Sequence, residues 1–171
     1  VGSIKDEGAV DVFVRSGTTW TQQARFSVPG AESWARGGHA VAIDGDTLLT
    51  AAPLDGDDET VGFSGSVDVF VRSGTTWSRQ ARLTASDASP RTYFGSSVSL
   101  SGDTAVIGTY GISPSSTEVG DVYVFVRSGT TWTQQAKLAP SDGEAGDVFG
   151  FSVSVHGDSI LVGAIGDDDD G

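Results

Sequence analysis

The nine residues VFVRSGTTW occur three times in this 171-residue chain, at Val12–Trp20, Val69–Trp77 and Val124–Trp132. A second motif recurs in the same register, as GHAVAIDGDTLLTAAP from Gly38, FGSSVSLSGDTAVIGTY from Phe94 and FGFSVSVHGDSILVGAI from Phe149. Self-similarity at a nearly fixed period of 55 to 57 residues indicates an array of one structural unit. The chain therefore contains copies of a single unit and not a set of unrelated domains.

Each unit contains four short segments with the patterns of β-strands. The first alternates small polar and apolar residues, as in Ser97–Leu100, whereas the second and third are continuous apolar runs, as in Ala105–Gly108 and Tyr123–Val126. Glycine-containing turns join the first segment to the second (Ser101-Gly102-Asp103) and the third to the fourth (Ser128 to Thr131). The unit is therefore predicted to be a four-stranded antiparallel meander.

The fourth segment begins at the tryptophan that closes the nine-residue motif. Its alternation predicts one face with Trp132, Gln134, Ala136 and Leu138, and an opposite face with Thr133, Gln135 and Lys137. Trp20, Trp77 and Trp132 could form platforms for sugars, but their predicted position on the same face as Ala24, Ala81 and Ala136 favours packing between units.

Two of the four strands are apolar on both faces and therefore need cover on both sides. Radial packing of meanders, each against the next, supplies this cover. We therefore predict an all-β fold, a β-propeller of four-stranded antiparallel blades. A linear solenoid of stacked sheets is the competing arrangement.

The repeat register places the units at residues 1–36, 37–93, 94–148 and 149–171. The first holds only the third and fourth strands and the last only the first and second, so the chain amounts to three blade equivalents: two complete blades and two half blades. Because propellers close with about four to eight blades, three are too few. We expect either two chains to join as a six-bladed ring or further repeats of a longer chain to complete it. We also expect the half-blades to be association sites and the isolated chain not to be a stable monomer.

Several elements of the repeat resemble the FG-GAP repeat of integrin α-subunit propellers and of bacterial and archaeal surface proteins. They are Phe94-Gly95 and Phe149-Gly150 before the first strand, and Ala51-Ala52-Pro53 or Gly163-Ala164-Ile165 after the second. The first complete copy departs from the pattern with Gly37-Gly38, and the next with Gly108-Thr109-Tyr110. The resemblance implies a propeller module used in adhesion or protein interaction.

Charge and composition narrow the classes of partner. The chain has 10 Lys and Arg against 23 Asp and Glu, a net charge of −13, and no cysteine. Thiol and disulfide chemistry is excluded, and the acidic balance disfavours nucleic acid. No apolar stretch is long enough for membrane insertion. An acidic surface suits an extracellular or cell-surface location.

Calcium is the best-known ligand of the resembled family, held by an acidic loop between the first two strands. The corresponding turns here are tight hairpins with one or two carboxylates, so that loop does not carry over. Two other acidic loops could contribute calcium ligands, Asp55–Glu59 (with Asp55, Asp57, Asp58 and Glu59) and Asp167–Asp170. The equivalent stretch Ile112–Thr117 has no carboxylate, which favours solvated acidic loops over a shared calcium site.

No catalytic constellation is recognisable, and we predict that the chain is not an enzyme. The two histidines, His39 and His156, occupy different positions in their repeats, and no serine sits in a Gly-x-Ser-x-Gly elbow. No metal-binding or cofactor-binding residue is assigned. Trp34 lies outside the repeat register as a candidate exposed aromatic.

The sequence therefore predicts a non-catalytic extracellular or cell-surface scaffold for adhesion, protein interaction or self-assembly through open blade edges. Its partners would be other copies of itself or further repeats, and a protein or glycan ligand. The loops that differ most between copies, Pro29–Gly37, Asp55–Ser64 and Gly111–Gly120, are the candidate recognition segments. A carbohydrate-binding propeller, calcium-assisted or not, and a propeller domain of a larger secreted enzyme are the alternatives.

Overall fold

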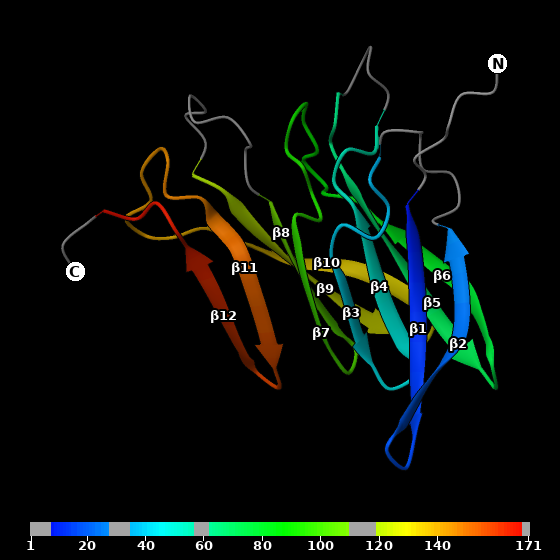
Figure 1. Cartoon of the computed structure of the whole chain (residues 1–171). Coiled ribbons are helices and arrows are strands. Elements are labelled where there is room, and N and C mark those ends of the chain that lie inside the picture. Colours follow the sequence, from blue (N-terminus) through cyan, green and yellow to red (C-terminus); the bar gives the residue numbers. More distant parts are fainter. Residues whose placement is uncertain (1–7, 28–34, 57–61, 110–118, 169–171) are drawn as a thin grey trace, which may run out of the picture.

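The computed structural model describes residues 8–27, 35–56, 62–109 and 119–168. These residues form twelve strands in four antiparallel sheets, and the described ranges contain no helix (Figure 1). The predicted all-β fold is confirmed.

Two of the sheets are complete four-stranded blades whose strands follow chain order. Blade 2 contains β3 (Val41–Asp44), β4 (Thr47–Ala52), β5 (Ser66–Ser73) and β6 (Thr76–Leu83), and blade 3 contains β7 (Ser97–Ser101), β8 (Thr104–Thr109), β9 (Asp121–Ser128) and β10 (Thr131–Leu138). The remaining sheets are two-stranded: blade 1 with β1 (Ala9–Ser16) and β2 (Thr19–Ser27), and blade 4 with β11 (Phe149–His156) and β12 (Ser159–Ala164). The apolar second and third strands are central in each complete blade, as their sequences require.

Tight two-residue turns join the first strand to the second and the third strand to the fourth. Gly45, Gly102 and Gly157 adopt φ of 54° to 56° between the first and second strands, and Gly17, Gly74 and Gly129 adopt φ of 62° to 64° between the third and fourth. This left-handed conformation is accessible to glycine without a steric cost, and it matches the twist of the flanking strands. The fully described connections between blades, residues 84–96 and 139–148, lie at the opposite end of the sheets from these turns (Figure 1).

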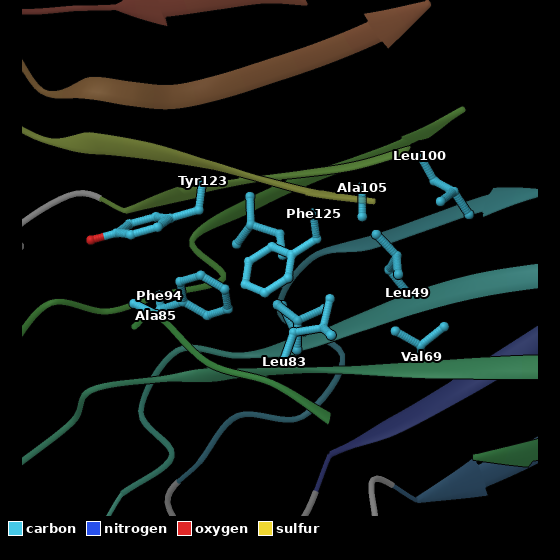
Figure 2. Close-up of a cluster of buried hydrophobic side chains, with 12 residues drawn as sticks. Leu49, Val69, Leu83, Ala85, Phe94, Leu100, Ala105, Tyr123 and Phe125 are labelled. Atoms are coloured by element: carbon cyan, nitrogen blue, oxygen red, sulfur yellow. The ribbon is translucent and has the colours of Figure 1, made fainter. Parts of the chain in front are cut away.

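The blades pack face to face around their first strands. β3 contacts β7 and β7 contacts β11 closely, whereas the fourth strands β6 and β10 have few contacts with each other. The blades therefore converge at their first strands and diverge at their fourth strands, as in a propeller. Figure 2 shows the main apolar cluster between blades 2 and 3, in which Leu49, Val69 and Leu83 come from blade 2 and Leu100, Ala105 and Phe125 from blade 3.

The expectation that Trp132 shares a face with Ala136 and Leu138 is wrong. A β-bulge shifts the β9–β10 register between Gln134 and Ala136, so that Trp132 pairs with Arg127 but Ala136 pairs with Val124. Because Arg127 and Val124 point to opposite faces of β9, the two halves of β10 also do. Trp132 consequently packs against blade 2, whereas Ala136 and Leu138 pack in the cluster shared with blade 4.

The same bulge recurs in the other two units. It lies between Val12 and Phe13 in the β1–β2 ladder and between Val69 and Phe70 in the β5–β6 ladder. Trp77 accordingly packs towards blade 1 while Ala81 and Leu83 pack towards blade 3. Packing between units is the role of Trp77 and Trp132, as expected, and the bulge lets one fourth strand serve both neighbouring blades.

Candidate functional site: open blade edges and a polar pocket

Within the described residues, two strands, β1 and β12, lack a neighbouring strand that their equivalents have in the complete blades. In each complete blade the second strand pairs with the third, as β4 with β5 and β8 with β9. In the half-blades the second-type strand β12 pairs with β11 alone, and the third-type strand β1 pairs with β2 alone. Within the described residues, β12 (a second strand of the repeat) therefore lacks a third strand beside it, and β1 (a third strand) lacks a second strand beside it.

Exposed apolar side chains gather at these open edges. The large apolar residues that remain exposed among those described are Phe13, Trp20, Val41, Ile43, Phe151, Leu161 and Ile165. They lie in or directly after the half-blades, except for Val41 and Ile43, which are on β3 of blade 2. An apolar patch rimmed by polar residues marks an interaction surface more often than a solvent-facing one.

Comparison between repeats shows that these exposures depend on position in the array. Phe13 is 54% exposed, but its equivalents Phe70 and Phe125 are only 4% and 5% exposed. Leu161 is 73% exposed, while its equivalents Leu49 and Val106 are completely buried. The same residue type is therefore buried wherever a neighbouring strand and blade are present.

An apolar hollow of about 230 Å³ lies between β1 and the start of blade 2. Its lining includes Val12 and Phe13 of β1 and Val41, Ile43 and Leu48 of blade 2. In blade 3 the equivalent residues of β7, Val98 and Leu100, pack against the first two strands of blade 2. The hollow thus marks the place where the first two strands of blade 1 would lie.

A second, polar cavity of about 370 Å³ lies at the end of blade 3 that carries the long connections. Its lining includes Asp87 and Thr92 from the connection between blades 2 and 3, and Asp121, Tyr123 and Lys137 from β9 and β10. Cross-strand pairing places Lys137 opposite Tyr123. The ammonium of Lys137 lies 5.4 Å from the centroid of the Tyr123 ring.

Lys137 and Tyr123 share a network of carboxylates. The Lys137 ammonium donates to Asp87 Oδ2 at 2.7 Å and lies 2.9 Å from Asp121 Oδ2, and the Tyr123 hydroxyl donates to Asp87 Oδ1 at 2.8 Å. Burial and the bond to Asp87 raise the pKa of Tyr123 to about 12, and the bond from Lys137 lowers the pKa of Asp87. Burial opposes the charge of Lys137, but its hydrogen bonds to Asp87 and Asp121 outweigh burial and raise its pKa. All four groups are held in one closed network.

The equivalent positions hold a different network in blade 2. Asp68 replaces Tyr123, and Arg82 replaces Lys137. Arg82 Nε lies 3.5 Å from Asp68 Oδ1, and Arg82 Nη2 lies 2.9 Å from Asp55 Oδ2. Ser66 also donates to Asp55 at 2.7 Å. Burial raises the pKa of Asp68, and the two guanidinium groups of Arg82 and Arg79 oppose this effect. Asp11 and Arg25 form the same cross-strand pair in blade 1, at 2.8 Å.

Sequence reasoning did not find the polar pocket. The signal was present as a departure from the repeat, because Tyr123 and Lys137 stand where the other copies have Asp and Arg. Interpreting it required knowledge that Asp87, from a connection with no repeat pattern, lies against this pair. That proximity is a property of the tertiary fold.

The acidic loops proposed for calcium are described only in part. Asp55 is partly buried and bound to Arg82 and Ser66, whereas Asp167 and Asp168 are exposed. Asp57, Asp58 and Glu59, like Asp169 and Asp170, lie outside the described residues. Within the described ranges, no three acidic or histidine side chains are grouped so that they could hold a metal ion.

The remaining candidate residues do not converge on one site. His39 precedes the first strand of blade 2, whereas His156 ends the first strand of blade 4, so the two lie at opposite ends of equivalent strands. Burial and the charge of Arg36 lower the pKa of His39. Trp34 and most of the variable loops, at 28–34, 57–61 and 110–118, lie outside the described residues.

The family model of the FG-GAP repeat matches residues 77–125 and 132–171. Together with the repeated blades, this match shows that the chain belongs to the FG-GAP repeat family, whose propeller domains serve in interaction and adhesion. Such repeats are typical of extracellular and surface proteins and are typically non-catalytic. A search of curated proteins found no match. Within the described residues, no helix is long and apolar enough to cross a membrane.

Proposed function

We propose that this chain is a non-catalytic extracellular or cell-surface scaffold that associates through its open blade edges and presents its loops to a protein or glycan ligand. The observation that carries the proposal is the difference in burial between equivalent residues. Phe13 and Leu161 are exposed at the half-blades, but their equivalents are buried in the complete blades. Apolar area of this kind is covered when strands pair at an edge, and burial contributes about 25 cal/mol per Å².

The state of the titratable groups supports a binding role over catalysis. Nucleophilic catalysis needs a base beside a nucleophile, and His39 and His156 lie at opposite ends of their strands. In the polar pocket, Lys137, Tyr123, Asp87 and Asp121 bond to one another. Such a network fixes the shape of the pocket and favours recognition by complementarity.

Light scattering of the 171-residue chain, with calcium and with a chelator, tests this function. We expect association in both buffers, because strand pairing and apolar burial need no metal. Alanine substitutions across residues 29–37, 55–64 and 111–120 should leave the assembled mass unchanged, because the proposed association uses strand pairing and apolar burial at the half-blades. A chain that stays monomeric and unfolds cooperatively at every concentration tested would contradict the scaffold function.

A carbohydrate-binding propeller is the second candidate, favoured by the 370 Å³ pocket with its hydroxyl, carboxylate and ammonium groups. Tyr123 is almost completely buried, so its ring face is not free to stack on a sugar, and hydrogen bonds would carry recognition. A glycan array probed with the wild type and with Lys137→Met tests this candidate. Glycan binding that is lost in the variant, with the assembled mass unchanged, would support it.

A further inference from the structure

Both complete blades pair their second and third strands in one register. In blade 2, Thr47 lies opposite Val71 and Leu49 opposite Val69. In blade 3, Thr104 lies opposite Val126 and Val106 opposite Val124. Counted along the repeat, these are the same pairs. The pairing register of the second and third strands is therefore a property of the repeat. We expect the same register wherever a second strand of this repeat pairs with a third strand.

We propose that β12 of one copy pairs antiparallel with β1 of a second copy and completes a four-stranded blade shared between the two chains. This inference rests on the proposed association through blade edges and names its partner and its register. The repeat places Ser159 opposite Val14, Leu161 opposite Val12 and Gly163 opposite Val10 of the second copy. These six residues come from the two strands whose edges are open.

A charge pair at the end of the ladder supports this register. In blade 2, Arg72 donates from its backbone N to the Asp46 carbonyl at 2.8 Å and from its side-chain Nε to Asp46 Oδ1 at 2.7 Å. Arg127 and Asp103 make the same two contacts in blade 3, at 2.8 Å and 2.7 Å. The equivalents of this pair, Arg15 and Asp158, lie on the two separate half-blades. Pairing β12 with β1 brings this arginine and this aspartate together.

A contact between successive blades supplies a second match. The Trp77 indole nitrogen donates to Gln23 Oε1 of blade 1 at 3.4 Å, and that of Trp132 donates to Gln80 Oε1 of blade 2 at 3.0 Å. In each pair, the tryptophan of one blade donates to the glutamine of the preceding blade. Gln135 in blade 3 and Trp20 in blade 1 are the repeat equivalents of these residues, and both are exposed. In the shared blade, Trp20 of the second copy would face Gln135 of the first.

The exposed apolar residues also become covered when β12 of one copy pairs with β1 of the second copy. In the cluster between blades 3 and 4, Val106 of β8 packs with Val153 and Val155 of β11. Leu161 is the repeat equivalent of Val106, and Val41 and Ile43 are the equivalents of Val153 and Val155. Leu161 of one copy therefore covers β3 of the second copy and fills the hollow beside its β1.

Two copies of these residues give a blade count that can close into a ring. The described residues of each copy form two four-stranded and two two-stranded sheets. Two copies joined at both edges make six blades, within the range of about four to eight found in closed propellers, whereas three copies would make nine. A two-fold ring also leaves no half-blade unpaired, which stops growth into a filament.

Disulfide trapping tests the register directly, because these 171 residues contain no cysteine. Val14→Cys and Ser159→Cys are made in separate chains, mixed and oxidised. Directly opposed residues in an antiparallel pair have Cα atoms about 4.5 to 5.5 Å apart, which suits a disulfide. We expect a covalent heterodimer in the mixture and little covalent product from either variant alone.

Ile160→Cys mixed with Val14→Cys is the register control. The proposed register places Ile160 opposite Phe13 and on the other face, so this mixture should trap at least tenfold less than the Ser159→Cys mixture. Equal trapping by both mixtures would overturn the register. Absence of trapping while light scattering still shows an associated chain would overturn the strand pairing and leave the scaffold function standing.

Leu161→Asp, compared with Thr75→Asp, tests the apolar contact. Both add one carboxylate to an exposed position, but Thr75 is in the β5–β6 turn of blade 2, away from both edges. We expect Leu161→Asp to raise the dimer dissociation constant at least tenfold and Thr75→Asp to leave it unchanged. The circular dichroism of both variants checks the fold. Equal dissociation constants for the two folded variants, or a wild-type mass other than that of two chains, would overturn the proposal.

Discussion

The indole nitrogen of Trp132 in blade 3 donates a hydrogen bond of 3.0 Å to the side-chain oxygen of Gln80 in blade 2. The guanidinium of Arg127 covers the same indole ring at 5.2 Å and also donates to Thr47 Oγ1 of blade 2 at 3.0 Å. One blade thus contacts the preceding one through an arginine and a tryptophan that belong to the same repeated motif. The arginine and the tryptophan of VFVRSGTTW therefore both contribute to contacts between blades.

Replacing Gln80 with alanine should destabilise the contact between blades 2 and 3. The variant leaves the half-buried Trp132 indole without its acceptor, and we expect the free energy of unfolding to fall by about 1 kcal/mol. Urea unfolding, followed by tryptophan fluorescence, measures this change. Gln135→Ala is the matched control, because Gln135 is exposed, and below the association concentration it should cost less than about 0.5 kcal/mol. Equal losses for both variants would refute the role of the bond.

The sequence predicted the repeat, the strands and the hairpin turns, because each depends on local pattern and on glycine at a fixed place. It did not predict the bulge in the fourth strand, which reverses the face of Ala136 relative to Trp132. Gln134 and Gln135 satisfy the alternating pattern equally well, so the extra residue leaves no local trace. Its cause is tertiary: the two ends of the strand must face different neighbouring blades.

Gly95→Ala tests why the Phe-Gly pair is needed before the first strand. Phe94 is completely buried, and Gly95 has a φ of 96°, where a Cβ would lie 2.9 Å from the Ala51 Cβ and 3.1 Å from Val67 Cγ2. The backbone conformation and the crowding should together cost roughly 1 to 3 kcal/mol of stability. Thermal unfolding measures this loss. Gly129→Ala is the control for φ alone, because its φ is also positive but no atom lies within 4 Å of the added Cβ. Equal losses in the two variants would show that crowding contributes nothing.

One candidate site could be predicted from local sequence pattern, and the other depends on tertiary contacts. The half-blades were predicted from the repeat count alone, and the structure shows their two-stranded sheets with open edges. The polar pocket was not predicted, since Asp87 and Lys137 are 50 residues apart and only the packing of a connection against β10 joins them. Repetition in sequence identifies a shared scaffold, whereas a pocket made by one unit alone depends on contacts outside the repeat.

Asp87→Asn should change the pH dependence of the free energy of unfolding at acid pH. The hydrogen bond from Lys137 lowers the pKa of Asp87 in the folded chain below its unfolded value of about 3.9. The charged carboxylate therefore contributes stability above about pH 4, and this contribution is lost as the pH falls through the folded pKa. Because both side chains are partly exposed, we expect less than about 1 kcal/mol. The difference in unfolding free energy between wild type and variant should shrink from pH 6 towards acid, and a constant difference would contradict the assignment.

Tyr123→Phe should remove a tyrosine whose hydroxyl ionises at an unusually high pH. Its pKa of about 12 lies above the usual value of 10, first because the ring is buried and then because the hydroxyl donates to Asp87. The protonated hydroxyl therefore contributes stability below pH 10, and this contribution is lost as the pH rises from 10 to about 12. Ultraviolet absorbance measures phenolate formation in the wild type minus that in the variant. The difference should have a midpoint well above 10, and a midpoint at or below 10 would contradict the buried bond.

Calcium should leave the thermal stability of the chain unchanged. Asp55, the described member of the first acidic loop, already binds the Arg82 guanidinium at 2.9 Å and accepts from Ser66, so a calcium ion would have to displace a charged partner. Ligands that bind only the folded state raise stability as their concentration exceeds the dissociation constant. We therefore expect the same melting temperature in calcium and in chelator. Arg82→Gln is the informative comparison, because it frees Asp55 while keeping a polar side chain. A calcium-dependent rise in the wild type would show that the acidic loops bind the ion despite Arg82, and a rise only in Arg82→Gln would show that the arginine occupies the place of a cation.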